Sequence, residues 1–132
     1  MGNRAVITFD KKLNPNSLGI YLHWNGGRDS VQAFLDATRE LMKSRGPDSQ
    51  YAPARLVQVI GNFMGGSLSL GLSPLSQCDT DNGDNGTYVV DPESLQIVAR
   101  KHVRHGEQNK KEHYEGVYAE CIEKNKAIFK AE

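Results

Sequence analysis

The sequence has no long apolar run, no net charge and few cysteines, and each absence excludes a class of function. No stretch approaches the roughly 18 apolar residues that a bilayer-spanning helix needs, so we expect no membrane partner. Sixteen basic residues balance sixteen acidic ones, so no global field draws the chain to DNA or makes it an acidic DNA mimic. The first residues lack the pattern of a secretory signal. Cys78 and Cys121 allow one disulfide, but reduced thiols and a cytoplasmic location are favoured.

Motifs for metals and for catalysis are also missing. The four histidines have no HExxH spacing, and no GxSxG segment is present, so we expect no cofactor, no metal and no enzyme activity. The segment 79–86, DTDNGDNG, does not fit a calcium-binding EF-hand loop that starts at Asp79 or at Asp81, because the required glycine and the final acidic residue are not in place. Tight turns are the favoured interpretation, and polar ligand contact by Asn82, Asp84 or Asn85 is the alternative.

The apolar pattern predicts one domain over 1–132, of the α+β class, with the order ββααβββα and a mostly antiparallel sheet. Strands are predicted at 5–9, 18–24, 67–73, 87–91 and 95–104, and helices at about 30–45, 53–64 and from 112. The polar segment 73–87 is expected to be a mobile loop. The predicted inner faces of the helices comprise Val31, Phe34, Leu35, Leu41 and Met42, then Leu56, Val59, Ile60, Phe63 and Met64, then Tyr114, Val117, Tyr118, Cys121 and Ile128.

The segment 23–30, HWNGGRDS, joins a predicted strand to a predicted helix and has two interpretations. As a corner, Asn25-Gly26 forms a type I′ turn, Asp29 or Ser30 caps the helix, and Trp24 lies in the core. As a ligand site, the helix N-terminus offers unpaired N–H groups, Trp24 stacks on a base, and Arg28 binds a phosphate. A turn and a cap do not require Arg28, which makes it the first candidate ligand residue.

Two more polar clusters have both a structural and a functional interpretation. Arg55, Gln58 and Asn62 form a stripe beside the apolar face of the second helix, either solvated or binding an anion near the helix start. Strand alternation places Arg100, His102 and Arg104 on one face, either exposed to water or receiving a phosphate.

Three segments, GIYLHWNGGRDSVQAFL, ARLVQVIGNFMGGSLSLGL and DTDNGDNGTYVV, resemble the Thoeris anti-defence sponge family of phage proteins, the first of its two types. The resemblance covers most of residues 2–104 and is thinner in the C-terminal helix, 112–132. It implies a noncatalytic protein that sequesters a cyclic ADP-ribose isomer, an immune signal of the host, in the host cytoplasm without cleaving it. It also implies a homo-oligomer, a dimer or larger, with separate sites for cyclic oligonucleotides.

Together, the resemblance and the clusters predict one ligand site and one second nucleotide site. The resemblance implies Arg28 and a late-sheet arginine, Arg100 or Arg104, as ligand residues, and Arg55 for a second nucleotide site. The predicted ligand site comprises Trp24, Asn25, Arg28, Asn82, Asp84, Asn85, Arg100 and Arg104, and the second site comprises Arg55, Gln58 and Asn62. Two other functions remain open from the residues alone: an inhibitor that binds a host defence protein, and a small nucleotide-processing enzyme.

Overall fold

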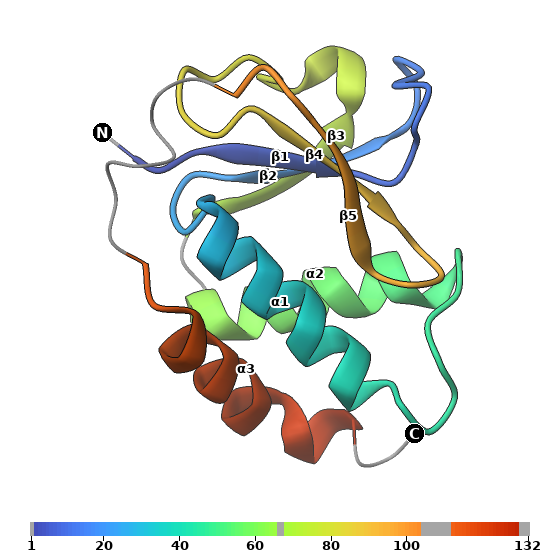
Figure 1. Ribbon diagram of the computed structural model, residues 1–132, viewed down its shortest axis with the longest axis vertical. Helices are drawn as coiled ribbons and strands as arrows, with labels where there is room; N and C mark the ends of the chain where they lie inside the picture. Colours follow the sequence, from blue (N-terminus) through green and yellow to red (C-terminus); the bar gives the residue numbers. More distant parts are fainter. Residues whose placement is uncertain (1, 66–67, 104–111, 130–132) are drawn as a thin grey trace.

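A five-stranded sheet carries three helices on one face (Figure 1). The computed structural model describes residues 2–65, 68–103 and 112–129. In chain order the elements are β1 (Ala5–Thr8), β2 (Leu18–Leu22), α1 (Arg28–Leu41), α2 (Tyr51–Met64), β3 (Leu70–Pro74), the short 3-10 helix η1 (Leu75–Gln77), β4 (Thr87–Asp91), β5 (Gln96–Lys101) and α3 (Tyr114–Phe129). The predicted α+β class and the order ββααβββα are confirmed.

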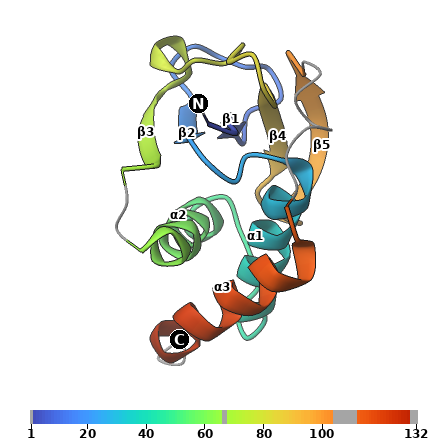
Figure 2. The same ribbon diagram turned by 90° about the vertical axis from the view of Figure 1, so that its left-hand side faces the viewer.

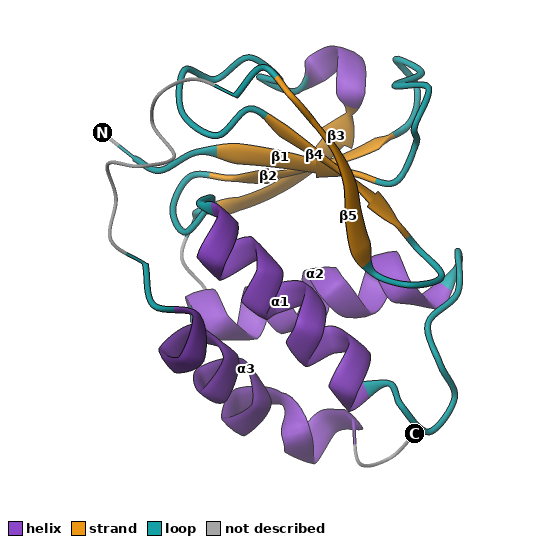
Figure 3. Ribbon diagram, in the orientation of Figure 1, coloured by secondary structure: helices purple, strands orange, loops and turns teal. Residues whose placement is uncertain are grey.

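The strands lie in the order β3-β2-β1-β4-β5. Figure 3 draws them as orange arrows on one side of the purple helices α1, α2 and α3. β1 pairs antiparallel with β2 and parallel with β4, and the outer pairs β2–β3 and β4–β5 are antiparallel. The parallel pair follows from the long excursion through α1, α2 and β3, which returns the chain to the other side of β1. The sheet is therefore mostly antiparallel, as predicted.

The sheet is covered on both faces. α1 and α2 pack against one face, and α3 packs on α1 and α2 (Figure 2). In β1, Ala5 and Ile7 belong to the core cluster on the helix side, whereas Val6 and Thr8 point to the opposite face. All four residues are fully buried. The helices cover Ala5 and Ile7, and η1 and the long loops cover the second face, on which Val6 and Thr8 lie (Figure 1).

The predicted inner faces of the helices form the core. The fully buried helical side chains include Val31, Phe34 and Leu35 of α1 and Leu56, Val59 and Ile60 of α2. Removing each such side chain from water stabilises the fold by about 1.5–3 kcal/mol. Val117 and Cys121 of α3 are buried as predicted, and the side chain of Ile128 lies outside the described residues.

Most element boundaries differ from the prediction by a few residues, and the start of α2 differs for a local reason. α2 begins at Tyr51 rather than Pro53, because a carboxylate oxygen of Asp48 accepts the N–H of Gln50 at 2.9 Å and that of Tyr51 at 2.8 Å. Arg55 is therefore past the first turn of α2, where it no longer opposes the helix dipole strongly.

The last strand is shorter than predicted. β5 ends at Lys101, and His102 has a φ of 58°, which breaks the alternation of side chains. The predicted strand face shared by Arg100 and His102 is therefore wrong, and Arg104 lies outside the described residues. Within the described part of the chain, no helix has the length and apolar character to cross a membrane.

Candidate functional site

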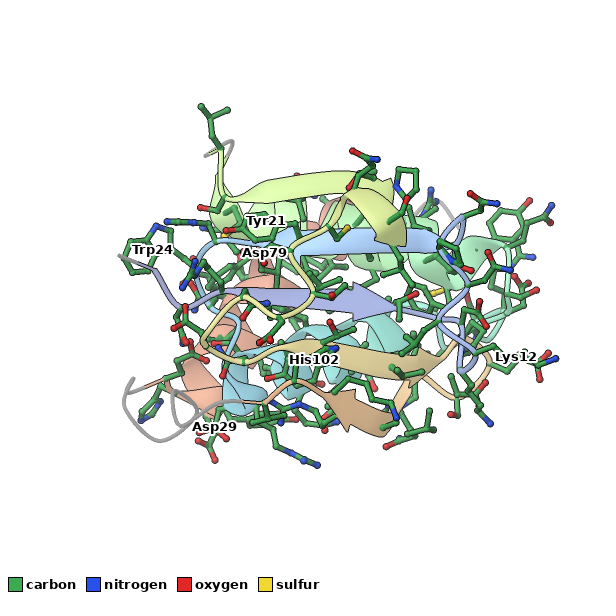
Figure 4. The ribbon with its side chains drawn as sticks, turned by 90° about the horizontal axis from the view of Figure 1, so that it is seen from above. Lys12, Tyr21, Trp24, Asp29, Asp79 and His102 are labelled. Atoms are coloured by element: carbon green, nitrogen blue, oxygen red, sulfur yellow. The ribbon has the colours of Figure 1, made fainter. Side chains whose placement is uncertain are left out.

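Four chain segments meet at one end of the sheet. The strand registers place the starts of β1 and β4 beside the ends of β2 and β5, and α1 begins just after β2. Figure 4 shows Trp24 and Asp29 at this end, and Lys12 at the opposite end. We call it the site end, because residues of the predicted ligand site in segment 23–28, in loop 79–86 and in late β5 all lie there.

The aromatic residue of the site end is exposed. Trp24 is 47% accessible, so its predicted place in the core is wrong. Its ring meets the imidazole of His23 edge-on, with centroids 5.5 Å apart, and His23 hydrogen-bonds the hydroxyl of Tyr21 at 2.9 Å. This arrangement leaves indole surface free for a stacking partner.

The turn after Trp24 is held by close backbone packing. Asn25 has a φ of 59°, but Gly26 does not have a positive φ, so the predicted type I′ turn is wrong. A Cβ on Gly26 would lie 2.5 Å from the carbonyl oxygen of Asn3 and 2.8 Å from the Cβ of Ala5. Glycine is needed here for space, because the start of β1 lies directly against the turn.

The N-terminus of α1 is occupied by a carboxylate of the protein itself. The N-cap residue is Gly27, so the predicted caps at Asp29 and Ser30 are wrong. The backbone N–H groups of Gly27 and Ser30 donate to the carboxylate of Glu112 at 3.3 and 3.4 Å, and the side-chain amide of Asn3 also donates to it. Unpaired N–H groups and the helix dipole attract an anion, which Glu112 supplies.

Sequence reasoning missed Glu112 because it lies far from α1 in the sequence. The contacts join residues 82 and 85 positions apart, and no local pattern links them.

Arg28 is the first residue of α1, and its side chain is exposed. It forms no hydrogen bond or ion pair with any residue that the structure describes. The neighbouring Asn25 is less free, because its amide donates to the hydroxyl of Ser30 at 3.1 Å. Of these two predicted ligand residues, only Arg28 makes no side-chain hydrogen bond to the part of the chain that the structure describes.

The polar loop 79–86 uses most of its side chains to hold itself in place. The side-chain oxygen of Asn82 accepts the N–H groups of Asp84 and Gly86 at 3.1 and 3.0 Å. Asn85 donates to the carbonyl oxygen of Arg4 at 3.0 Å, and Asp84 forms a 2.8 Å ion pair with the Arg4 guanidinium. Asn82 and Asn85 are buried, so these amides stabilise the turns of the loop.

Arg100 lies at the site end and is anchored there. Its guanidinium donates to the carbonyl oxygen of Asn85 at 3.0 Å and lies 4.0 Å from the ring centroid of Tyr88. The Tyr88 hydroxyl in turn donates to the carbonyl oxygen of Gly26 at 2.7 Å. The positive charge of Arg100 is thus fixed close to the glycine turn.

One residue of the second predicted cluster, Asn62, lies in a helix interface. The amide of Asn62 donates to Asn125 of α3 at 2.7 Å, and Asn125 donates to the carbonyl oxygen of Cys121 at 2.8 Å. Arg55 and Gln58 are half-buried. The interpretation of the stripe as a solvated surface is therefore wrong for Asn62.

In the described ranges, no group of three or more His, Cys, Asp and Glu side chains is placed to hold a metal ion. Comparison of the chain with protein-family models, with curated proteins and with solved structures found no match. The function is therefore inferred from the chemistry of the site end and from the resemblance of three sequence segments to the Thoeris anti-defence sponge family.

Proposed function

We propose that the protein binds a cyclic nucleotide immune signal, a cyclic ADP-ribose isomer, and sequesters it without cleavage as a phage counter-defence protein. The observation that carries the proposal is the exposed guanidinium of Arg28, which has no partner among the described residues, together with the exposed indole of Trp24 in the same short segment. A pyrophosphate needs charge-assisted donors, and a base needs a flat apolar surface. Both groups lie in one short segment at the site end.

Glu112 defines how the phosphate would be bound. Because its carboxylate already accepts the N–H groups of Gly27 and Ser30, the N-terminus of α1 is not open to a second anion. Arg28 would then be the main phosphate donor, and the anchored Arg100 would add positive potential behind it. In this proposal Asn82 and Asn85 shape the site by holding the loop.

The proposal is of a noncatalytic protein, and the titratable groups at the site end support it. The pair that most resembles a base and a nucleophile is His23 and the hydroxyl of Tyr21, 2.9 Å apart. Burial raises the pKa of Tyr21, which disfavours the phenolate that a nucleophile would need.

Self-association and a second nucleotide site extend the proposal. Leu68, two residues before β3, is fully exposed, and Leu72 within this edge strand is 55% exposed; these exposed leucines support a homo-oligomer. A site for cyclic oligonucleotides would use Arg55 and Gln58 of α2, but not Asn62, whose amide contacts α3.

Thermal unfolding in the presence of cyclic ADP-ribose isomers tests the proposal. A ligand at one hundred times its dissociation constant stabilises the folded state by about 2.7 kcal/mol. We expect such stabilisation for at least one isomer, and chromatography should recover the ligand intact after the protein is denatured. Arg28→Ala should abolish the shift, whereas Lys12→Ala, an exposed cation at the opposite end of the sheet, should retain it.

Three results would contradict the proposal. The absence of a shift with every isomer would remove the ligand, and unchanged binding by Arg28→Ala would remove the site. A product that appears during incubation would make the protein an enzyme. Co-purification of a host protein without any nucleotide binding would instead favour the inhibitor alternative, for which exposed Leu68 and Leu72 offer a contact surface.

A further inference from the structure

A cavity of about 180 Å³ lies on the sheet face opposite the helices. It lies between η1, the loop that joins β1 to β2, and the end of β5; Figure 4 looks onto this face and shows His102 there. Leu13, Pro15 and Leu75 give it apolar walls. None of the predicted ligand residues that the structure describes lines it, so we treat it as a separate site.

The mouth of the cavity is polar and positively charged. Lys101 and His102 line it together with Ser76, Thr80 and Thr87, and none of the described lining residues is acidic. Lys101 and His102 make no side-chain hydrogen bond or ion pair with other described residues. Their donors are therefore available to an anionic group beside an apolar chamber.

The walls are fixed before any ligand arrives. The carboxylate of Asp10 accepts the N–H groups of Lys12 and Asn14, both at 2.9 Å, and the hydroxyl of Ser17 at 2.6 Å, which holds the loop that carries Leu13. On the other side of the cavity, the backbone of residues 101–102 packs tightly on Gly86. A Cβ on Gly86 would lie 2.1 Å from the carbonyl oxygen of Lys101. Preformed walls spare a ligand the entropic penalty of ordering them.

Two wall residues have an unusual backbone conformation. Leu13 and His102 have φ values of 55° and 58°, which bulky residues rarely adopt. Such conformations persist only where the surroundings impose them, and they cluster at ligand sites. Two of the four described non-glycine residues with positive φ thus line one cavity.

We propose that this cavity binds a small ring-shaped molecule with one anionic group, separately from the nucleotide signal. A cavity of about 150 Å³ holds one benzene molecule, so this one fits a single substituted ring and is too small for a whole dinucleotide. The ring lies against Leu13, Pro15 and Leu75, and the anion lies at Lys101 and His102. Aromatic carboxylates and ring phosphates share this chemistry.

Amide chemical-shift titration of the full chain, with benzoate, phenyl phosphate and neutral benzyl alcohol as probes, tests the site. We expect saturable shifts at Ser76, Thr80, Lys101 and His102, with a dissociation constant on the order of 1 mM for a ligand of about nine non-hydrogen atoms. Tighter binding of benzoate would identify the natural ligand as a carboxylate, and tighter binding of phenyl phosphate would identify it as a phosphate. Benzyl alcohol should bind several-fold more weakly.

Matched variants separate the charge from the walls. Lys101→Met should weaken the anionic probes several-fold and leave benzyl alcohol unchanged, whereas Lys43→Met, an exposed lysine after α1, should change neither. Leu13→Gly removes an apolar wall and tolerates the positive φ, so it should weaken all three probes without unfolding the protein. Arg28→Ala should bind benzoate as the unmodified protein does.

The proposal is overturned by shifts that do not saturate or that map elsewhere. Equal affinity for benzyl alcohol and benzoate overturns it too, as does unchanged benzoate affinity in Lys101→Met.

Discussion

Replacement of Glu112 tests whether the carboxylate at the start of α1 holds the structure together. In Glu112→Ala, the N–H groups of Gly27 and Ser30 and the side-chain amide of Asn3 lose their common acceptor. In Glu112→Gln, the remaining oxygen can still accept from Asn3 and Gly27, so the losses are the charge and the long hydrogen bond from Ser30. The two variants therefore separate the hydrogen bonds from the interaction of the charge with the helix dipole.

The magnitude follows from the geometry. At 3.3 and 3.4 Å the two backbone hydrogen bonds are long and therefore weak, and the charge at a helix N-terminus contributes about 0.3–1 kcal/mol. Asn3 is 3% exposed, and a buried donor left without a partner costs about 1–3 kcal/mol. We expect Glu112→Ala to lower the free energy of unfolding by about 2 kcal/mol and Glu112→Gln by about 0.5 kcal/mol.

Urea denaturation measures both values, and thermal unfolding should show a fall in Tm of about 4 °C for each kcal/mol. Glu93→Ala is the matched control, because Glu93 is an exposed carboxylate in the turn between β4 and β5 and should change stability by less than about 0.5 kcal/mol. If Glu112→Ala is as stable as this control, the carboxylate does not hold α1, and the reasoning fails.

The same variants test how Glu112 affects the proposed binding of a nucleotide signal. If the carboxylate competes with the ligand phosphate for the start of α1, loss of its charge in Glu112→Gln should tighten binding about two- to fivefold, from the 0.3–1 kcal/mol of the helix dipole interaction. Weaker binding by Glu112→Gln would show instead that the carboxylate supports the ligand site.

Three further predictions concern other parts of the molecule. Tyr114→Phe should lower the free energy of unfolding by about 1.5 kcal/mol, because the Tyr114 hydroxyl donates a 2.6 Å hydrogen bond to the carboxylate of Asp36. This hydrogen bond, and then burial, raises the pKa of Tyr114 to about 12. The stabilisation by the Tyr114 hydroxyl is therefore fully present below pH 10, the pKa of tyrosine in the unfolded chain being about 10, and it is lost as the pH rises towards 12. Measurement of the free energy of unfolding at increasing pH tests this. Burial raises the pKa of the Cys121 thiol to about 12, whereas Cys78 is only half-buried. Iodoacetamide should therefore alkylate Cys78 first, as mass spectrometry will show, and equal labelling of both cysteines would contradict the packing of α3. Gly26→Ala should destabilise the fold by about 1–3 kcal/mol in urea denaturation, since its Cβ would meet backbone atoms, and a neutral effect would contradict the described turn.

The sequence predicted the elements because the periodicities that reveal them are local. Val31, Phe34 and Leu35 recur at helical spacings and are buried, and the β-branched residues of β1 and β4 form central strands. The order of strands in the sheet was not predictable to the same degree, because the parallel pairing of β1 with β4 depends on packing across the whole domain.

The site was predicted less well, because its contacts are long-range. Arg4 with Asp84 and Asn85 with Asn3 join residues about eighty positions apart, and a single sequence carries no signal for such pairs. Trp24 was the clearest error in the corner interpretation: an aromatic residue after a strand is usually buried, but Trp24 lies beyond the end of β2 and is 47% exposed.

The two glycines of segment 23–30 have a physical explanation that does not involve a ligand. Gly26 lets the start of β1 approach the turn, and a Cβ on Gly27 would lie 2.5 Å from a carboxylate oxygen of Glu112. A glycine-rich helix start that admits an internal carboxylate has the same sequence pattern as one that admits a phosphate, because both need an anion close to bare backbone N–H groups. The pattern alone therefore cannot identify a nucleotide site. Arg28 and Trp24 can be explained neither by the turn nor by the cap, and so the proposed binding of a nucleotide signal depends on these two side chains.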